Sequence, residues 1–192
     1  METETLLSIL VGIGLSAACG FRVFVPLLVM SIASLSGHLT LSSGTQWVGT
    51  YPALLALAVA TILEILGYYI PWVDHFLDLI STPAAITAGI LAMGGAIHGM
   101  SPFLRWTLAV IAGGGIAGGV QAITGMTRLA SAATTGGLGN PLIATAELGG
   151  STLLSVLAII IPLIAAALVF ALIYLALTII RKRKKGLQPN RA

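Results

Sequence analysis

Long apolar segments dominate this chain and decide what it can fold into. A helix needs about 20 residues to cross the hydrocarbon layer of a membrane, which is about 30 Å thick. Five segments reach or approach this length, at residues 6–35, 53–71, 83–98, 103–124 and 152–180. Hydrophobic residues make up 57% of the chain and charged residues only 8%, whereas about a quarter of the residues of a soluble domain are charged. The sequence therefore predicts an integral membrane protein.

Several of these segments must break or bend. Thirty helical residues extend roughly 45 Å, so the first and last segments are too long for one straight crossing. Gly20 or Pro26 can break the first, and Pro162 the last. Residues 125–151 contain the stretch TTGGLGNP, which we expect either to form a loop or to dip into the membrane and return. The predicted fold is an all-α polytopic membrane bundle of five to seven membrane segments, with broken or re-entrant helices.

The basic residues predict the domain limits and the orientation. Five of the nine lie at residues 181–185, directly after the last apolar segment, so we expect one transmembrane domain over 1–180 and a basic cytoplasmic tail over 181–192. A nucleic-acid partner is not expected, because no other basic or aromatic cluster accompanies the run. With five crossings, the loop at 98–105 shares the cytoplasmic side, while residues 72–82 and the glycine-rich stretch face outside.

Two stretches of the chain echo each other faintly. LLSILVGIGLSAACGFRVF and LAVIAGGGIAGGVQAITGMTRL both run from an apolar helix through small residues to an arginine, Arg22 and Arg128. Each half then supplies a glutamate, Glu64 and Glu147. Such an echo is typical of the inverted repeats of small transporters. Chance similarity between glycine- and alanine-rich sequences is the alternative.

Charged residues inside the apolar segments are the candidate functional groups. An arginine midway along a membrane segment is costly unless it is paired, hydrated or able to reach the interface. We therefore expect Arg22 and Arg128 to pair with Glu64 and Glu147, in an order that the sequence leaves open. Such pairs can serve only to lock helices together. Four charges beside glycine-rich helices favour instead a water-filled path or a binding site for a charged solute.

Two further patterns carry candidate polar groups. Asn140 and Pro141 can begin a helix, whose buried N-terminus would suit an anion or a carboxylate; an ordinary loop is the alternative. A second set of polar residues is spaced so that its members would share one face of a helix, and it predicts a proton path if that helix continues through Pro71. The alternative is an interfacial helix with one face in water. The members of that path are Glu64, Tyr68, His75 and Asp78.

Metal binding and catalysis have little support in the sequence. Asp74, His75 and Asp78 lie close together in the chain, but no second cluster of ligands accompanies them, so we expect no metal site. The motifs of metalloproteases and serine hydrolases do not occur. We therefore expect no catalytic residues, no cofactor and no enzymatic activity.

Three motifs carry a resemblance to a known family. SAACGFRVFVPLL, ILEILGYYIPWVD and TGGLGNPLIATAE occur in the order seen in the uncharacterised bacterial membrane family catalogued as domain of unknown function 4126 (DUF4126), which the chain resembles up to about Pro162. The variant TAELGGS is similar to cyanobacterial members, which implies a bacterial inner (plasma) membrane or a thylakoid membrane. The resemblance implies a fold type and no activity.

The sequence leaves two functional hypotheses of different kinds. The first is a transporter or channel for a small ion or metabolite, which uses buried Arg and Glu groups near the bilayer midplane and is proton-coupled through Glu64 or Glu147. The second is a non-transporting structural or assembly subunit of a larger membrane complex. An intramembrane enzyme acting on lipid is a remote third. Expected partners are the lipid bilayer, the solute, and either other copies of the chain or subunits of a membrane complex.

Overall fold

The computed structural model describes the backbone of residues 2–186 and all side chains in that range except those of residues 71, 72, 74, 75, 176, 177 and 179–186. Its secondary structure over this range is helical and contains no β-strand. The elements in chain order are α1 (Glu2–Phe21), α2 (Phe24–Leu35), η1 (Gln46–Gly49), α3 (Tyr51–Gly67), α4 (Pro71–Ala96), α5 (Pro102–Leu108), η2 (Ala109–Gly113), α6 (Gly114–Thr135), α7 (Asn140–Ile160) and α8 (Pro162–Gly186).

Seven apolar helical segments are present in the described part of the chain. Four are long and apolar enough to cross a membrane, at Glu2–Phe21, Phe76–Ala96, Pro102–Thr135 and Asn140–Ile160. Three shorter apolar helices cover Phe24–Leu35, Tyr51–Gly67 and Pro162–Leu175. The prediction of an all-α membrane bundle with five to seven segments is confirmed.

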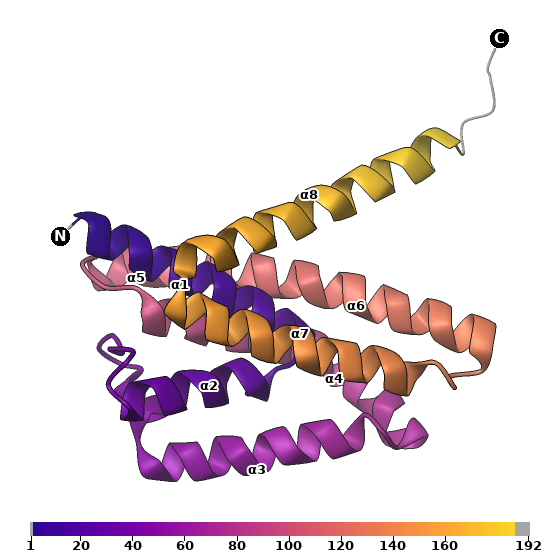
Figure 1. Cartoon of the computed structure of the whole chain (residues 1–192), viewed down its shortest axis with the longest axis horizontal. Coiled ribbons are helices and arrows are strands. Elements are labelled where there is room, and N and C mark those ends of the chain that lie inside the picture. Colours follow the sequence, from indigo (N-terminus) through magenta and orange to yellow (C-terminus); the bar gives the residue numbers. More distant parts are fainter. Residues whose placement is uncertain (1, 187–192) are drawn as a thin grey trace.

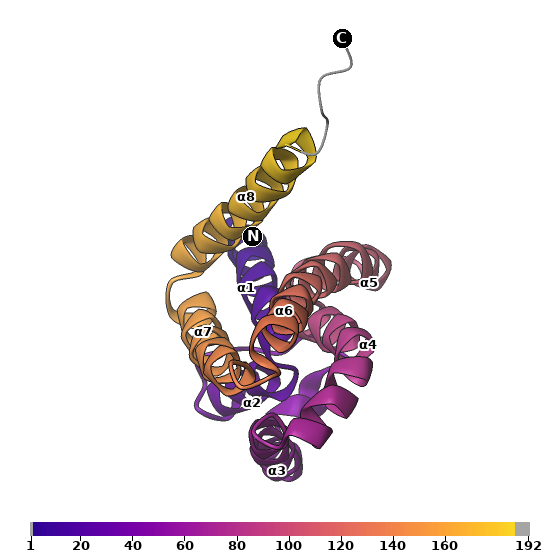
Figure 2. The same ribbon diagram turned by 90° about the vertical axis from the view of Figure 1, so that its right-hand side faces the viewer.

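Helix α1 lies at the centre of the bundle and packs against α4, α6, α7 and α8 (Figures 1 and 2). Small residues make these contacts close. A Cβ atom added to Gly20 would lie 2.6 Å from the carbonyl oxygen of Ala117 on α6, and one added to Gly14 would lie 2.6 Å from the Cβ of Ala158 on α7. Glycine at such positions lets helix backbones approach each other, as membrane helices require in the absence of a hydrophobic driving force.

The first apolar segment forms a helical hairpin. Figure 1 shows α2 running back from the end of α1. At the start of α1, Ser8 Oγ accepts a hydrogen bond of 3.2 Å from the backbone N–H of His98. After α2, the Ser42 hydroxyl donates a hydrogen bond of 2.6 Å to the carbonyl oxygen of Gly94. Both partners lie near the C-terminal end of α4, so α1 begins and α2 ends at the same end of the bundle.

The break in this segment falls between Phe21 and Phe24, at neither of the two predicted positions. Gly20 lies within α1. Pro26 lies in the first turn of α2, where its missing N–H removes no helical hydrogen bond. Hydrogen bonds from the backbone N–H groups of Val23 and Phe24 to Glu64, described below, hold the start of α2 in place.

Residues 72–82 do not form a separate interfacial segment. They belong to α4, which continues past Pro83 to Ala96. The chain reverses earlier instead, because α3 ends at Gly67 and α4 begins with Pro71, a residue favoured at the first helical position. The prediction that residues 64–78 lie along one face of a continuous helix is therefore wrong.

Residues 125–151 do not dip into the bundle and return. Helix α6 continues to Thr135, and α7 begins at Asn140. The turn between them needs only four residues because Gly136 (φ 63°) and Gly137 (φ 89°) adopt the left-handed conformation that favours glycine. Asn140 is the first residue of α7, and no side chain caps this helix at Gly139.

The two segments that echo each other run in the same direction. On α1, Ser16 donates a hydrogen bond to the carbonyl of Gly89, and Gly12 packs on Met93 nearer the end of α4. On α6, Arg128 meets Asp78 near the start of α4. Both helices are therefore antiparallel to α4 and parallel to each other. An inverted repeat relating these two segments is wrong.

The loops also lie at other ends of the bundle than the five-crossing topology predicts. Helix α8 begins beside the middle of α1, where Ala165 lies close to Gly14. It runs toward the end at which α6 turns into α7, whereas α5, which carries Arg105, lies at the opposite end (Figure 1). The prediction that residues 98–105 share a side with the basic run is thus wrong, because the break at Ile161 adds one reversal between them. Helix α8 continues to Gly186, so residues 181–186 are helical, and 187–192 lie outside the described residues.

Candidate functional site

The charged residues predicted from the sequence meet in one place. They come from the end of α1, from α3, α4, α6 and α7, which are far apart in the chain. Most are buried, although they carry charge. We call this group the charge cluster, and its members are Arg22, Glu64, Tyr68, Asp78, Arg128 and Glu147.

Glu147 on α7 is the partner of both arginines. Its Oε1 accepts a hydrogen bond of 3.1 Å from Nε of Arg128, and its Oε2 accepts a second from Nη2 of the same side chain. Oε2 also lies 3.7 Å from Nη2 of Arg22. A two-point contact between guanidinium and carboxylate is the strongest type of ion pair. The sequence left open which glutamate pairs with which arginine, and in the structure Glu147 pairs with both.

Glu64 on α3 has a different role. Its Oε1 accepts a hydrogen bond of 2.7 Å from the backbone N–H of Val23, and its Oε2 accepts one of 3.1 Å from that of Phe24. These N–H groups lie at the N-terminus of α2, where helical donors lack partners and the helix dipole is positive. Within the described residues Glu64 forms no ion pair with Arg22 or Arg128, so its predicted pairing is wrong. Its carboxylate caps α2 from another helix.

Tyr68 joins the two arginines at the end of α3. The guanidinium carbon of Arg22 lies 3.9 Å from the centroid of its ring, and that of Arg128 lies 4.0 Å from it. Cation–π contacts of this kind are strongest when they are shielded from water, and Tyr68 is buried. Nη1 of Arg128 also donates a hydrogen bond of 2.6 Å to Oδ1 of Asp78, whose side chain is 31% exposed.

The charge cluster lies off the middle of the bundle, on the side of the turn between α6 and α7. Glu147 follows Asn140, the first residue of α7, by seven positions, which is roughly 10 Å along a helix, and α7 has 21 residues. Arg128 likewise precedes Thr135, the end of α6, by seven positions. The charge cluster thus lies between the middle of these two helices and the turn that joins them.

The remaining predicted residues lie beside the cluster. Asn140 is buried and shares one face of α7 with Ala144 and Glu147, at helical spacings of four and three. The carbonyl oxygen of Ala144 accepts a hydrogen bond of 2.7 Å from Nη2 of Arg22. Tyr68 and Asp78 reach Arg128 from two different helices and not along one stripe. The side chain of His75 lies outside the described residues.

Sequence reasoning missed a second buried polar contact. Nε2 of Gln121 on α6 donates a hydrogen bond of 2.7 Å to Oγ of Ser81 on α4. Gln121 carries the one side-chain amide in the apolar segment 103–124, so the composition of this segment could have pointed to Gln121 as a buried polar residue. The backbone acceptor at Ala144 left no signal, because any residue supplies a carbonyl group.

A cavity of about 330 Å³ lies between α3 and α4 beside the charge cluster. We call it the α3–α4 slot. Glu64 and Tyr68 line it together with the first turn of α2, and apolar side chains form most of the remaining wall. The lining residues are Val23, Phe24, Ala60, Leu63, Glu64, Tyr68, Leu77, Ile80, Ser81 and Ala84.

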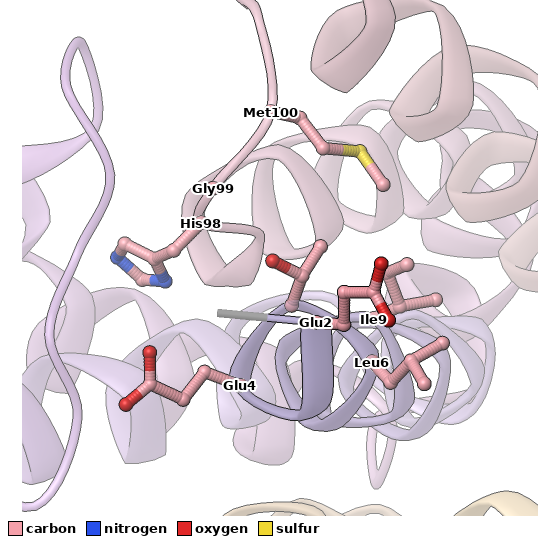
Figure 3. A pocket seen from close by; sticks show the side chains of 8 residues that line it. Glu2, Glu4, Leu6, Ile9, His98, Gly99 and Met100 are labelled. Atoms are coloured by element: carbon pink, nitrogen blue, oxygen red, sulfur yellow. The ribbon is translucent and has the colours of Figure 1, made fainter.

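A second cavity of about 520 Å³ lies at the opposite end of the bundle, where α1 begins. His98 and the two N-terminal glutamates line it, and Figure 3 shows the carboxylates of Glu2 and Glu4 pointing away from each other. Nowhere in the described part of the chain do three or more His, Cys, Asp and Glu side chains form a group that could hold a metal ion. This cavity is separate from the charge cluster.

Fold and site together define a class: a polytopic helical membrane protein with a buried cluster of charges at the junction of five helices. The profile of the family described as Domain of unknown function (DUF4126) matches residues 9–182. The chain therefore belongs to this family, and the resemblance carried by its three motifs is confirmed. No curated protein matches the chain, and no solved structure does.

Proposed function

We propose that this protein is a transporter or channel for a small ion or metabolite, with the charge cluster as its polar site. One observation carries the proposal. Glu64 both belongs to the charge cluster and lines the α3–α4 slot, so a buried polar centre adjoins an open cavity. Membrane proteins that move solutes typically combine broken helices, buried charges and a cavity in this way.

Arg22 adds support. It is 2% exposed, yet its Nε and Nη1 form no hydrogen bond with the described residues. A buried donor without a partner is costly. These two groups are therefore expected to bind water or an oxygen of a solute. Asp78, being partly exposed, offers a polar approach to Arg128 from the nearer end of the bundle.

The test measures flux in proteoliposomes that contain the full chain. Protons serve as one probe, followed with an enclosed pH-sensitive dye, and radiolabelled small inorganic ions serve as the others. We expect flux in the parent protein and at least a tenfold reduction in Glu64→Gln. The glutamine keeps the size of the side chain and one acceptor for the α2 N–H groups, so the variant should elute as a single folded species. Glu2→Gln, at the opposite end of the bundle, is the matched control and should match the parent.

Two outcomes would remove the transporter proposal. One is the absence of flux for every probe in the parent protein. The other is an unchanged rate in Glu64→Gln, since the polar site would then play no part in the flux.

A structural or assembly subunit of a larger membrane complex is the second candidate. The observation that favours it is the buried ion pair between Arg128 and Glu147, because such pairs also fix helix register. This candidate predicts that the protein purifies in mild detergent with membrane subunits in a fixed ratio. Isolation as a single chain or as a homo-oligomer would count against it.

A further inference from the structure

The α3–α4 slot opens sideways, toward the layer that lipid would occupy. Helices α3 and α4 meet closely at their joint, where a Cβ atom on Gly67 would lie 2.6 Å from Cδ1 of Leu77. Farther from the joint α3 packs mainly on α2, and Figure 2 shows α3 at the edge of the bundle. Leu63 and Ile80 on the slot wall are 63% and 44% exposed. A ligand can therefore enter from the hydrocarbon layer between these two helices.

The wall of the slot is apolar except at its inner end. Glu64 is the one charged group among the described residues that line it, and the hydroxyl groups of Tyr68 and Ser81 are the other polar ones. Neither Arg22 nor Arg128 is among the described residues that line the slot. The slot thus presents a carboxylate at the end of an apolar chamber.

Glu64 can still accept hydrogen bonds from a ligand. A carboxylate offers about four acceptor positions, and the N–H groups of Val23 and Phe24 use one on each oxygen. A cation near a buried carboxylate gains more electrostatic energy than it would in water, because the surrounding dielectric constant is low. The chamber is also within the size range of small-molecule sites, roughly 300–1,000 Å³.

We propose that the α3–α4 slot binds an amphipathic monovalent cation, whose apolar body lies between α3 and α4 and whose charge faces Glu64. This inference deepens the proposed function and rests on it for the role of the ligand as a transported solute. A cation without an apolar body would reach Glu64 without making any contact with the apolar wall of the slot. An anion of the same shape would meet the carboxylate and be repelled.

The test compares two probes of nearly identical shape and opposite charge. Tetraphenylphosphonium is a hydrophobic cation, and tetraphenylborate is its anionic counterpart. Equilibrium binding of each is measured on the full chain in lipid nanodiscs, with binding to empty nanodiscs subtracted. We expect saturable binding of the cation and none of the anion. Glu64→Gln should weaken cation binding at least tenfold.

Two further variants locate the site. Ala60→Leu places a larger side chain on the slot wall and should weaken binding of the cation at least tenfold without changing any charge. Gly119→Leu is the matched control, because Gly119 lines the groove between α6 and α8 and a Cβ atom there meets nothing within 4 Å; it should bind as the parent does. A folded, monodisperse protein is required of each variant, and Ala84→Leu, on the facing wall, replaces Ala60→Leu if that variant does not fold.

The inference is overturned if the cation shows no saturable binding, if the anion binds equally well, or if binding is insensitive to Glu64 and to the slot variants. Equal binding of both probes would identify the slot as a site for apolar chains regardless of charge. Binding and flux fail separately. If the protein binds the cation but shows no flux of any probe, the transporter proposal is rejected and the binding site in the slot stands. If it shows ion flux but does not bind the cation, only the proposed binding site is rejected.

Discussion

Oε1 of Glu64 accepts a hydrogen bond of 2.7 Å from the backbone N–H of Val23, although the two residues lie 41 positions apart in the chain. This contact explains how one apolar segment becomes a hairpin. The first N–H groups of a helix lack intrahelical partners, and a buried helix start without acceptors is unfavourable. Glu64 supplies the acceptors from α3, so α2 can begin inside the bundle and bring Arg22 to Glu147.

Removing the shared carboxylate should destabilise the protein strongly. In Glu147→Gln, Arg22 would lose its carboxylate partner and Arg128 would lose one of its carboxylate partners, while both remain buried. Breaking a buried ion pair by removing one partner typically costs about 3–5 kcal/mol. We expect a large fall in the melting temperature in mild detergent, and no measurable change for the exposed control Glu2→Gln. Equal stability of the two variants would mean that the arginines find other partners.

The ring of Tyr68 should matter more than its hydroxyl group. Both guanidinium groups lie over this ring, and a desolvated cation–π contact contributes about 2 kcal/mol. Tyr68→Leu should therefore lower the free energy of unfolding in SDS titrations by about 2 kcal/mol or more. Tyr68→Phe keeps the ring and should retain most of that energy. A Phe variant as unstable as the Leu variant would assign the effect to the hydroxyl group.

Close helix packing predicts opposite effects for two glycines. A Cβ atom on Gly89 would lie 2.5 Å from the Cβ of Ala117 and 2.7 Å from the carbonyl oxygen of Gly113. Gly89→Ala should therefore cost about 1–3 kcal/mol through overpacking. Gly119→Ala meets open space and should be neutral or stabilising by up to about 1 kcal/mol, because alanine favours the helix. Thermal unfolding of both variants, compared with the parent, checks this pair.

The arrangement of the helices predicts a topology that can be labelled. The start of α5, which follows Ser101, and the start of α1 lie at one end of the bundle (Figure 1). The turn between α6 and α7, which contains Leu138, lies at the other end, and Leu138 is 85% exposed. Single cysteines at Thr3 and Ser101 should react with an impermeant maleimide from one side of the membrane, and a cysteine at Leu138 from the other. From the positive-inside rule we expect the Leu138 side, which is also that of the basic run at 181–185, to face the cytoplasm. The native Cys19 is buried and can be replaced by serine to remove background labelling. Labelling of Ser101 and Leu138 from the same side would contradict the arrangement.

Local features of the sequence were sufficient for several elements. Apolar length predicted the membrane class, and Pro162 marked the break between α7 and α8, where α8 begins. These features depend on hydrophobicity, backbone geometry and side-chain size, which are properties of single residues and short segments.

Other elements could not be predicted because they depend on contacts between distant residues. The first segment was expected to break at Gly20 or Pro26, but the hydrogen bonds from Val23 and Phe24 to Glu64 decide the position. The hairpin also changed the topology, since each additional reversal moves every later loop to the opposite side of the bundle. The echo between the two arginine segments carried no information about direction, which only packing against α4 reveals.

The sequence by itself determined that Arg22, Glu64, Arg128 and Glu147 need polar surroundings, because an apolar layer penalises any charge that lacks a partner or solvent. Only the tertiary structure decided how this need is met, with Glu147 shared by two guanidinium groups and Glu64 left to cap a helix and line the slot. The physical reason is that the cost of burying a charge belongs to the residue, whereas its compensation depends on distances between groups that the chain brings together only when it folds.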